Sequence, residues 1–219
     1  MSRKTMGLDD AVIDYVRAYG LREGEIARAL REETGRMPQA NMQISAEQGQ
    51  FLALLLEIMG ARRVIEVGTF TGYSALWMAE AIGPEGLLVA CDVSDEWTAV
   101  ARRYWGMADV QDRISLRLGD ARDTLQALLQ ESRGTWDLVF VDADKSGYAA
   151  YAELAHALLR EGGVLAVDNT LWSGKVLELE GADADTAAIH AFNQALVGDE
   201  RWTVSLLPIG DGLTLARKR

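Results

Sequence analysis

Cysteine and histidine are scarce in this chain of 219 residues, which contains one cysteine and two histidines. Cys91 cannot form an internal disulfide, and because neither histidine is near it in the sequence we expect a buried, unreactive thiol. His156 and His190 fall in segments with a helical pattern, so we expect them to be structural or solvent-facing. These residues therefore do not indicate a catalytic site.

Positive charge is also in deficit. The chain has 22 Lys and Arg against 33 Asp and Glu, a formal net charge of −11, which argues against broad binding to nucleic acids or anionic membranes. No hydrophobic run is long enough to span a membrane, and residues 1–6 are followed by Asp9 and Asp10 rather than by the apolar run of a signal peptide. We therefore expect a cytoplasmic protein with no membrane partner.

Apolar and helical stretches alternate from residue 63 onwards. The short apolar runs predict strands at 63–67, 87–91, 114–118, 137–141 and 163–167. The stretches between them predict helices at about 73–82, 95–106, 121–131 and 147–160. This alternation is typical of an α/β fold in which a mostly parallel sheet carries helices on both faces.

The C-terminal segment predicts a hairpin. A helix around 185–197 precedes two further strands, at 202–207 and 213–217, which are joined by Gly210-Asp211-Gly212. One of the seven predicted strands should therefore run antiparallel to the rest.

Residues 1–45 precede this pattern and predict a helical extension. Helices are expected at 8–20 and 23–34, and the first carries an apolar face made by Leu8, Val12, Tyr15, Val16 and Tyr19. The apolar surface of these two extra helices favours a homodimer.

A third helix is predicted from Ala46 to Met59. Ser45 and Gln48 resemble a capping box at its start, and its many apolar residues predict that it is well buried. Because no linker, repeat or low-complexity run divides the chain, we expect a single domain over residues 1–219.

Three residues with oxygen-bearing side chains directly follow two of the predicted strands. Asp142 follows Val139-Phe140-Val141, and the pair Asp168-Asn169 follows an apolar run that ends at Val167. Ligands bind at the carboxyl ends of the strands in an open α/β sheet. Two carboxylates and a carboxamide converging there would form a site for a hard divalent cation, although Asp168 taken alone is equally well a helix cap.

A glycine-bearing turn follows the first predicted strand, in Glu66-Val67-Gly68-Thr69-Phe70-Thr71-Gly72-Tyr73-Ser74. Glycine lets a ligand approach the backbone, and the helix N-terminus that follows favours an anionic group. Asp92 closes the second strand 24 residues after Gly68, where an acid commonly binds ribose hydroxyls. The turn is not Gly-x-Gly-x-x-Gly, which disfavours a dinucleotide, and alone it is equally well an ordinary strand-to-helix connection.

A third segment, Leu118-Gly119-Asp120-Ala121, ends the third predicted strand. An acid and a free backbone N–H at this place can read an adenine edge. One ribose-binding acid, one adenine-reading loop and one anion-holding turn suit an adenosine with a small charged tail. S-adenosylmethionine (SAM) has that shape, and its carboxylate would suit the N–H and hydroxyl groups near Ser74.

In these segments the chain resembles the cation-dependent O-methyltransferases, the family that contains catechol O-methyltransferase and the caffeoyl-CoA O-methyltransferases. The resemblance runs from about Met42 to the C-terminus. It is carried, in order, by Glu66-Val67-Gly68-Thr69, Thr71-Gly72-Tyr73-Ser74, Val141-Asp142-Ala143-Asp144-Lys145 and Asp168-Asn169-Thr170-Leu171-Trp172. It implies a Rossmann-like class I methyltransferase fold and O-methylation that uses SAM and a divalent cation.

The resemblance also implies roles for individual residues. It places the metal on Asp142, Asp168 and Asn169, and the spacing of all three disfavours the helix-cap interpretation. It places the cofactor on Glu66 and Asp92 (ribose), Gly68, Thr69 and Ser74 (methionine moiety), Ala121 (adenine), Asp144 (beside the cofactor), and Met42 and Ile44 (a segment that closes over the methyl donor).

The expected chemistry follows from the number of metal ligands. A Mg²⁺, Mn²⁺ or Ca²⁺ ion takes about six oxygens, so three protein ligands leave about three places for water and substrate, and two adjacent hydroxyls of one aromatic ring suit them. A bound cation lowers the pKa of such a hydroxyl, and Lys145 would accept the proton. The alternative is that Lys145 only pairs with Asp142 or Asp144. Trp172 and Tyr148 are candidate walls against the ring, and each is equally well explained by ordinary core or rim packing.

Other interpretations remain open at this point. Plant members of the family carry asparagine where this chain has Ser173, so a CoA-ester substrate does not carry over. Methylation of a hydroxylated uridine in tRNA would keep the chemistry and change the partner, although the charge of −11 disfavours it. A non-enzymatic nucleotide-binding module would use the acids only as helix caps.

Overall fold

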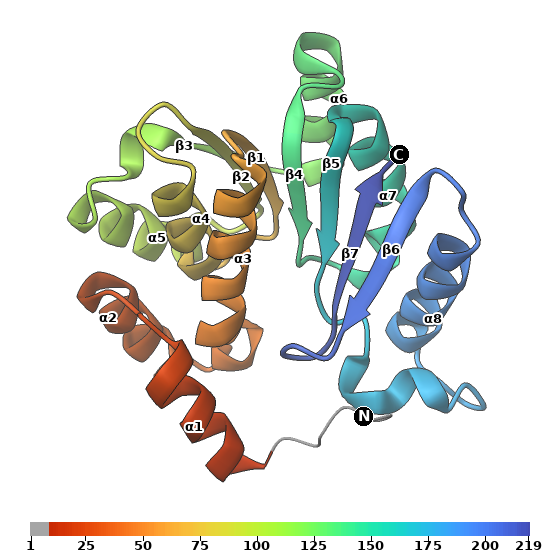
Figure 1. Cartoon of the computed structure of the whole chain (residues 1–219), viewed down its shortest axis with the longest axis horizontal. Helices are drawn as coiled ribbons and strands as arrows, with labels where there is room; N and C mark the ends of the chain where they lie inside the picture. The colour runs from red at the N-terminus through yellow and green to blue at the C-terminus, as the bar shows by residue number, and fades with distance from the viewer. Residues whose placement is uncertain (1–8) are drawn as a thin grey trace.

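A seven-stranded sheet forms the centre of the computed structural model, which describes residues 9–219. The strands lie in the order β3-β2-β1-β4-β5-β7-β6 (Figure 1). Their bounds are Arg63–Val67 (β1), Leu87–Asp92 (β2), Ile114–Leu118 (β3), Trp136–Val141 (β4), Leu159–Val167 (β5), Trp202–Leu207 (β6) and Leu213–Lys218 (β7). Strands β1 to β5 pair in parallel, and β7 runs antiparallel to both β5 and β6. The predicted α/β fold with one antiparallel strand is confirmed.

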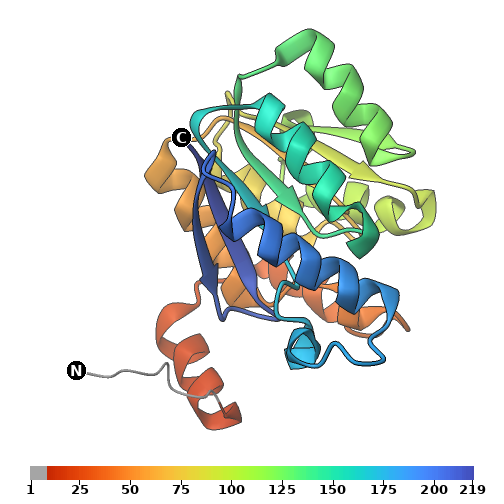
Figure 2. The same ribbon diagram turned by 90° about the vertical axis from the view of Figure 1, so that its right-hand side faces the viewer.

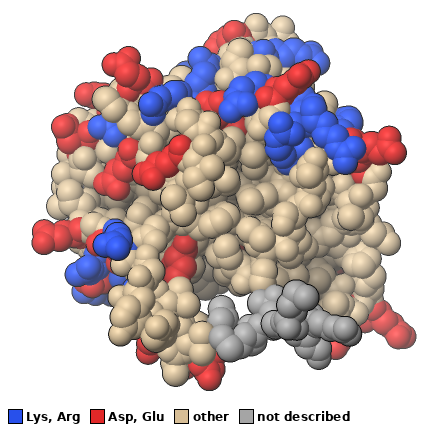
Figure 3. All heavy atoms as spheres, in the orientation of Figure 1, with Lys and Arg blue, Asp and Glu red and all other residues tan. Residues whose placement is uncertain are grey.

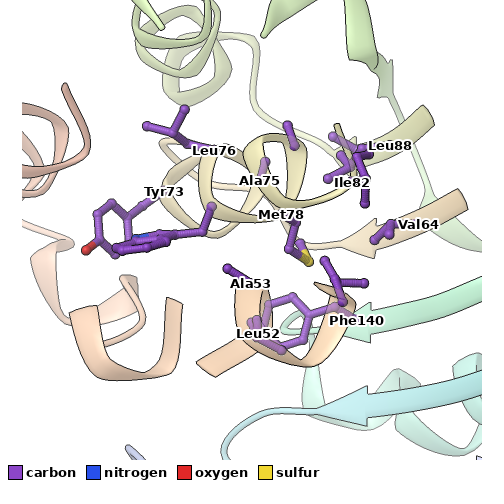
Figure 4. Close-up of a cluster of buried hydrophobic side chains, with 14 of the residues drawn as sticks. Leu52, Ala53, Val64, Tyr73, Ala75, Leu76, Met78, Ile82, Leu88 and Phe140 are labelled. Carbon is purple, nitrogen blue, oxygen red and sulfur yellow. The ribbon is translucent and has the colours of Figure 1, made fainter. Parts of the chain in front are cut away.

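Helices cover both faces of this sheet (Figures 1 and 2). One face carries α3 (Ala46–Met59), α4 (Tyr73–Ala81) and α5 (Asp95–Met107), and the other carries α6 (Ala121–Ser132), α7 (Tyr148–Leu158) and α8 (Ala184–Val197). Neighbouring strand residues point to opposite faces, as the pleat requires: Val64 joins the first core and Ile65 the second. In the first core, Met78 of α4 packs with Leu52 of α3 and Phe140 of β4 (Figure 4).

The start of β5 differs from the prediction. The helix that was expected to run to residue 160 ends at Leu158, and the strand begins at Leu159 instead of residue 163. Leu159 pairs with Trp136, and an irregularity in register precedes the pairing of Val164 with Leu138. Gly162 (φ +76°) lies within the irregular stretch, where a glycine permits a bulge.

The N-terminal extension contains α1 (Asp10–Gly20) and α2 (Glu25–Thr34), followed by the short helix η1 (Ala40–Met42). The predicted apolar face of α1 is present but not covered, since Tyr15, Val16 and Tyr19 are all exposed. Leu8, which was assigned to the same face, lies outside the described residues. The homodimer stays a prediction. The uncovered apolar face of α1 is part of the surface on which that prediction is based.

Helix α3 is only half buried, which corrects the expectation of a well-buried helix. Ser45 caps it by accepting a hydrogen bond from the Gln48 N–H at 3.2 Å. Leu52 and Leu56 are fully buried, whereas Leu54 is exposed and Ile58 is 75% exposed. An apolar composition did not distinguish the helix face that packs on α4 from the face that points away.

Between residues 9 and 219, no helix has the length and apolarity needed to cross a membrane.

Candidate active site

Four strands end at one large pocket. One residue beyond each strand, the backbone continues the sheet: Gly119 N–H donates to Asp92 O, Gly68 N–H to Cys91 O, Asp142 N–H to Val67 O and Asp168 N–H to Val141 O, at 2.8–3.0 Å. These bonds hold the first residues after the strands at one edge. The pocket that opens there has a volume of about 1230 Å³.

Most of the predicted site residues line this pocket. They are Met42, Ile44, Gly68, Thr69, Ser74, Asp92, Ala121, Asp142, Asp144, Lys145, Asp168 and Asn169. Glu66 is the exception, because it lies behind Ser74 and is not part of the lining. Segments from residue 42 to residue 169 are thus brought to a single cavity.

Gly68 lets the two halves of the site touch. Its φ of +90° is a conformation that L side chains rarely adopt. A Cβ at this position would lie 2.0 Å from the carbonyl oxygen of Asp142. Only glycine therefore allows the turn after β1 to pack against the turn after β4, where the acidic residues lie.

Asp92 holds that glycine turn in place. One oxygen of its carboxylate accepts the N–H groups of Thr69 at 3.0 Å and Phe70 at 2.7 Å, and the other accepts the N–H of Ser94 at 2.8 Å. Asp92 also lines the pocket. Its role in shaping the turn is visible in the structure, and ribose binding by the same carboxylate stays a prediction.

Glu66 is fully buried beneath the turn. Its Oε1 accepts a hydrogen bond from the Ser74 hydroxyl at 2.5 Å, while Oε2 has no partner among residues 9–219. Burial, reinforced by the charges of Asp142 and Asp92, raises the pKa of the Glu66 carboxyl to about 8. An unpartnered acceptor at this depth fits the prediction that Glu66 contributes to a polar ligand site.

The raised pKa of Glu66 predicts a pH-dependent stability of the free protein. The folded state binds a proton that the unfolded state releases above about pH 4.5, so stability should fall as the pH rises from about 4.5 to 8, by up to about 5 kcal/mol. Glu66→Gln should flatten this dependence in urea unfolding at pH 5.5 and 8. Glu57→Gln, at an exposed site on α3, serves as the control. Equal slopes in the wild type and Glu66→Gln would show that Glu66 does not cause the effect.

Asp120 and Asp144 have local partners that fix their positions. Asp120 caps α6 by accepting the Arg122 N–H at 2.8 Å, which places Ala121 in the pocket lining. Asp144 accepts hydrogen bonds from the hydroxyls of Tyr151 at 2.6 Å and Ser146 at 3.0 Å. Both acids therefore face the pocket from rigid settings.

The three predicted metal ligands meet at one corner of the pocket. Lys145 Nζ lies 2.5 Å from Asn169 Oδ1 and 3.5 Å from Asp142 Oδ1. The Asn169 N–H donates to Asp168 Oδ1 at 2.7 Å, and the Tyr148 hydroxyl donates to the Asp168 carbonyl at 2.7 Å. Asn169 has a φ of +57°, a strained conformation of the kind often found at functional sites.

The charges at this corner are suited to a cation. Burial raises the pKa of the Asp142 carboxyl, and burial together with the charge of Asp142 raises the pKa of Asp168 to about 7. Two neighbouring buried carboxylates repel each other, and the single Lys145 ammonium balances only one of them. Two carboxylates and one amide oxygen at the pocket edge match the ligand preferences of Mg²⁺ and Ca²⁺. Among residues 9–219 no three His, Cys, Asp or Glu side chains are placed to hold a metal ion together, and the set at this corner combines two acids with an amide.

Trp172 lines the pocket next to this corner, as predicted for an aromatic wall. Lys145 Nζ and Lys175 Nζ lie 5.6 and 5.7 Å from its ring centroid. Tyr148, by contrast, is not a wall but a core residue, which was the alternative for it. It is 1% exposed, packs against Phe192 and does not line the pocket, because its hydroxyl is drawn inward to the Asp168 carbonyl.

The expectations for Cys91 and the histidines agree with their positions. Cys91 is buried, and burial raises the pKa of its thiol to about 12. His156 packs against Trp202 at 5.0 Å, and His190 Nδ1 lies 3.3 Å from the Val176 carbonyl. Neither histidine lines the pocket, whereas Cys91, the last residue but one of β2, is part of its lining.

Several lining residues were not identified from the sequence. They include Gln48, Phe70, Tyr73, Trp97, Asp185 and Asp211. Gln48 was recognised only as part of a helix start, and Phe70 only as part of the turn. The glycine turn was the sequence signal available for Phe70 and Tyr73. Trp97 is brought to the pocket by an edge-to-face contact with Phe70, with the ring centroids 5.2 Å apart. Asp185 and Asp211 carry no comparable pattern.

Comparison with known proteins agrees with this geometry. A family model described as O-methyltransferase matches residues 17–219. Probable caffeoyl-CoA O-methyltransferase 2 of Dictyostelium discoideum is 45% identical over 179 residues, which cover 81% of this chain and 78% of that protein. Catechol O-methyltransferase domain-containing protein 1 of Mus musculus is 40% identical over 211 residues, covering 96% and 80%.

A similar structure has also been solved. It is the O-methyltransferase TomG from Streptomyces achromogenes, which is involved in tomaymycin synthesis and was crystallised in complex with SAM. It superposes with a TM-score of 0.87 at 31% identity, over 95% of this chain and 96% of that one.

Proposed function

The chain belongs to the O-methyltransferase family and is a SAM-dependent enzyme of the caffeoyl-CoA and catechol O-methyltransferase type, and we propose that it uses a divalent cation to methylate a hydroxyl of a catechol-type substrate. Mg²⁺ is the cation we favour, with Mn²⁺ and Ca²⁺ as alternatives. The acceptor would be a small molecule with two neighbouring hydroxyls on an aromatic ring.

The contact of Lys145 with two of the predicted ligands carries this proposal. The partly buried cationic nitrogen of Lys145 lies 2.5 Å from Asn169 Oδ1 and 3.5 Å from Asp142 Oδ1, in the cavity that Gly68 and Asp92 also line. These oxygens therefore already lie around a positive charge. The negative charge of the second carboxylate, Asp168, is not balanced by the single ammonium group of Lys145. A divalent ion supplies the missing charge, whereas helix caps would not need to converge.

Each half of the pocket then has a distinct task. SAM supplies the methyl group on its sulfonium, and a bound cation would polarise an acceptor hydroxyl and lower its pKa. Asp142, Asp168 and Asn169 would hold the cation, and the turn at Gly68 would hold the cofactor beside it. After its own ammonium proton has passed to solvent, the Lys145 amine would accept the hydroxyl proton. Trp172 packs at the same edge, where it limits water and orients a planar ring.

Methylation of tRNA fits the charge distribution less well. Basic side chains gather on the upper part of the molecule, where the C-terminus lies (Figure 3). Arg63 begins β1, and Arg217 of β7 pairs with Val164, which is level with Val64 near the start of β1, so both lie toward the opposite end of the sheet from the pocket. These two residues would hold an RNA at the end of the sheet away from Asp142.

The function is tested by a methylation assay over catechol-type acceptors with Mg²⁺ and with EDTA. We expect a catechol to be methylated with Mg²⁺ and the rate to fall to background in EDTA, because the acceptor loses its binding and activation together. An acceptor with one of the two hydroxyls already methylated should react poorly at either condition. Full activity in EDTA would contradict cation dependence, and methylation of bulk tRNA instead of catechols would favour the RNA alternative.

A further inference from the structure

Gln48 is a buried amide at the metal corner of the pocket. It lies in the first turn of α3, is 1% exposed and lines the same cavity as Asp168 and Asn169. Its Nε2 has no hydrogen-bond partner among residues 9–219. A buried amide donor without a partner is costly, so its retention at this place calls for a ligand or an acceptor that completes it.

The surroundings of Gln48 restrict where its amide group points. A Cβ on Gly210, in the turn between β6 and β7, would lie 2.5 Å from Gln48 Oε1, so only a glycine leaves room for the side chain. The oxygen end of the amide thus lies against the β6–β7 turn. The same turn accepts the Thr170 N–H through Gly212 O and the Leu171 N–H through Asp211 O, both at 2.9 Å, so the amide lies beside the segment that follows Asp168. In agreement with this position, Gln48 lowers the pKa of the Asp168 carboxyl.

Asp168 has an oxygen for this donor. The Asn169 N–H engages Oδ1 at 2.7 Å, and this bond uses only one of the two carboxylate oxygens. A carboxylate that binds a cation with one lone pair is held in place by hydrogen bonds to its remaining lone pairs. Gln48 is the neutral donor at the right place for that purpose.

We propose that Gln48 is a positioning residue for the metal site, which orients the Asp168 carboxylate through its amide N–H. The inference rests on the proposed cation dependence. It assigns Gln48 no contact with the reacting atoms. It also connects the N-terminal turn of α3, which directly follows the segment at Met42 and Ile44, to the metal ligands.

The test measures Mn²⁺ binding to Gln48→Met in the presence of SAM, by the electron paramagnetic resonance signal of free Mn²⁺. Methionine keeps the volume and removes the donor. We expect the Kd for Mn²⁺ to rise about tenfold or more, as is typical when an outer-shell partner of a metal ligand is removed. In activity assays the Mg²⁺ concentration for half-activation should rise, while kcat at saturating Mg²⁺ is largely recovered.

Gln50→Met is the matched control on the same helix. The Gln50 amide pairs with Gly20 O and the Arg22 N–H, both at 2.5 Å, and Gln50 does not line the pocket. Gln50→Met should lower the Tm in EDTA and leave the Kd for Mn²⁺ unchanged. Gln48→Met should leave the Tm in EDTA unchanged and raise the Kd for Mn²⁺. A Gln48→Met variant that loses Tm in EDTA and keeps the wild-type Kd would overturn the inference.

Asp168→Asn separates this inference from the proposed function. If Asp168→Asn loses Mn²⁺ binding and Gln48→Met keeps it, the metal site stands and the role of Gln48 is wrong. If the wild type and Asp168→Asn bind Mn²⁺ equally, the metal site itself is wrong and both proposals fail. Loss of affinity in both variants supports both.

Discussion

Replacing Asp142 with asparagine is expected to lower kcat/KM for a catechol by about 10³-fold, because a cation that polarises the acceptor contributes several kcal/mol to the barrier. The side chain keeps its shape, so the effect comes from the lost charge. Asp142 Oδ1 lies 3.5 Å from Lys145 Nζ, at the corner where Asn169 and Asp168 also meet. The measurement is steady-state methylation at saturating Mg²⁺, with SAM affinity determined separately by calorimetry.

Asp185→Asn is the matched control for this prediction. Asp185 lines the same pocket but is not one of the three proposed metal ligands, so its replacement removes one negative charge from the cavity and leaves all three ligands in place. Its kcat/KM should stay close to that of the wild type, and SAM affinity should be unchanged in both variants. Wild-type activity of Asp142→Asn in the presence of a chelator would rule out the mechanism.

Replacing Lys145 with methionine should lower kcat by about 10²-fold or more, the usual contribution of a positioned general base. Lys145 starts the short helix η3 (Lys145–Gly147), and its Nζ contacts both Asp142 and Asn169. Lys145 thus contacts two of the oxygens that would hold the cation, and the cation would in turn hold the acceptor. The assay should use saturating Mg²⁺, because the variant also removes positive charge from a pair of buried acids.

The pH profile distinguishes a base from a lysine that only pairs with Asp142. Without its base, the Lys145→Met variant should regain rate as the pH rises, since more of the acceptor is then ionised without help. Lys175→Met is the control, because Lys175 lies at a similar distance from the Trp172 ring but not at the ligand oxygens. A Lys145→Met variant whose kcat equals that of Lys175→Met would reduce Lys145 to a structural partner.

Much of this architecture is predictable from local sequence patterns. The apolar run at 63–67 is buried on both sheet faces, and so the run and the strand coincide. Residues directly after such runs must lie at one edge of a parallel sheet. For that reason Asp142 and Asp168 could be expected to meet although they are 26 positions apart.

The misjudged features depend on tertiary packing. Tyr148 and Trp172 look alike as aromatic residues near an acidic cluster, but the Asp168 carbonyl draws Tyr148 into the core. Ile58 looks like a core residue, yet its side of α3 faces away from α4. Gln48 shows only the pattern of a helix start in the sequence, because its place at the pocket depends on contact with Gly210, a residue 162 positions later.

The most direct test of the account is a crystal structure of the protein soaked with Mn²⁺ and SAM, with anomalous scattering recorded to locate the metal. The account predicts a peak at the end of β4 and β5, with oxygens of Asp142, Asp168 and Asn169 at about 2.0–2.6 Å. The contrary result is a map with no peak at this corner, or with Lys145 still bonded to Asn169 there, in crystals of protein whose catechol methylation depends on Mn²⁺.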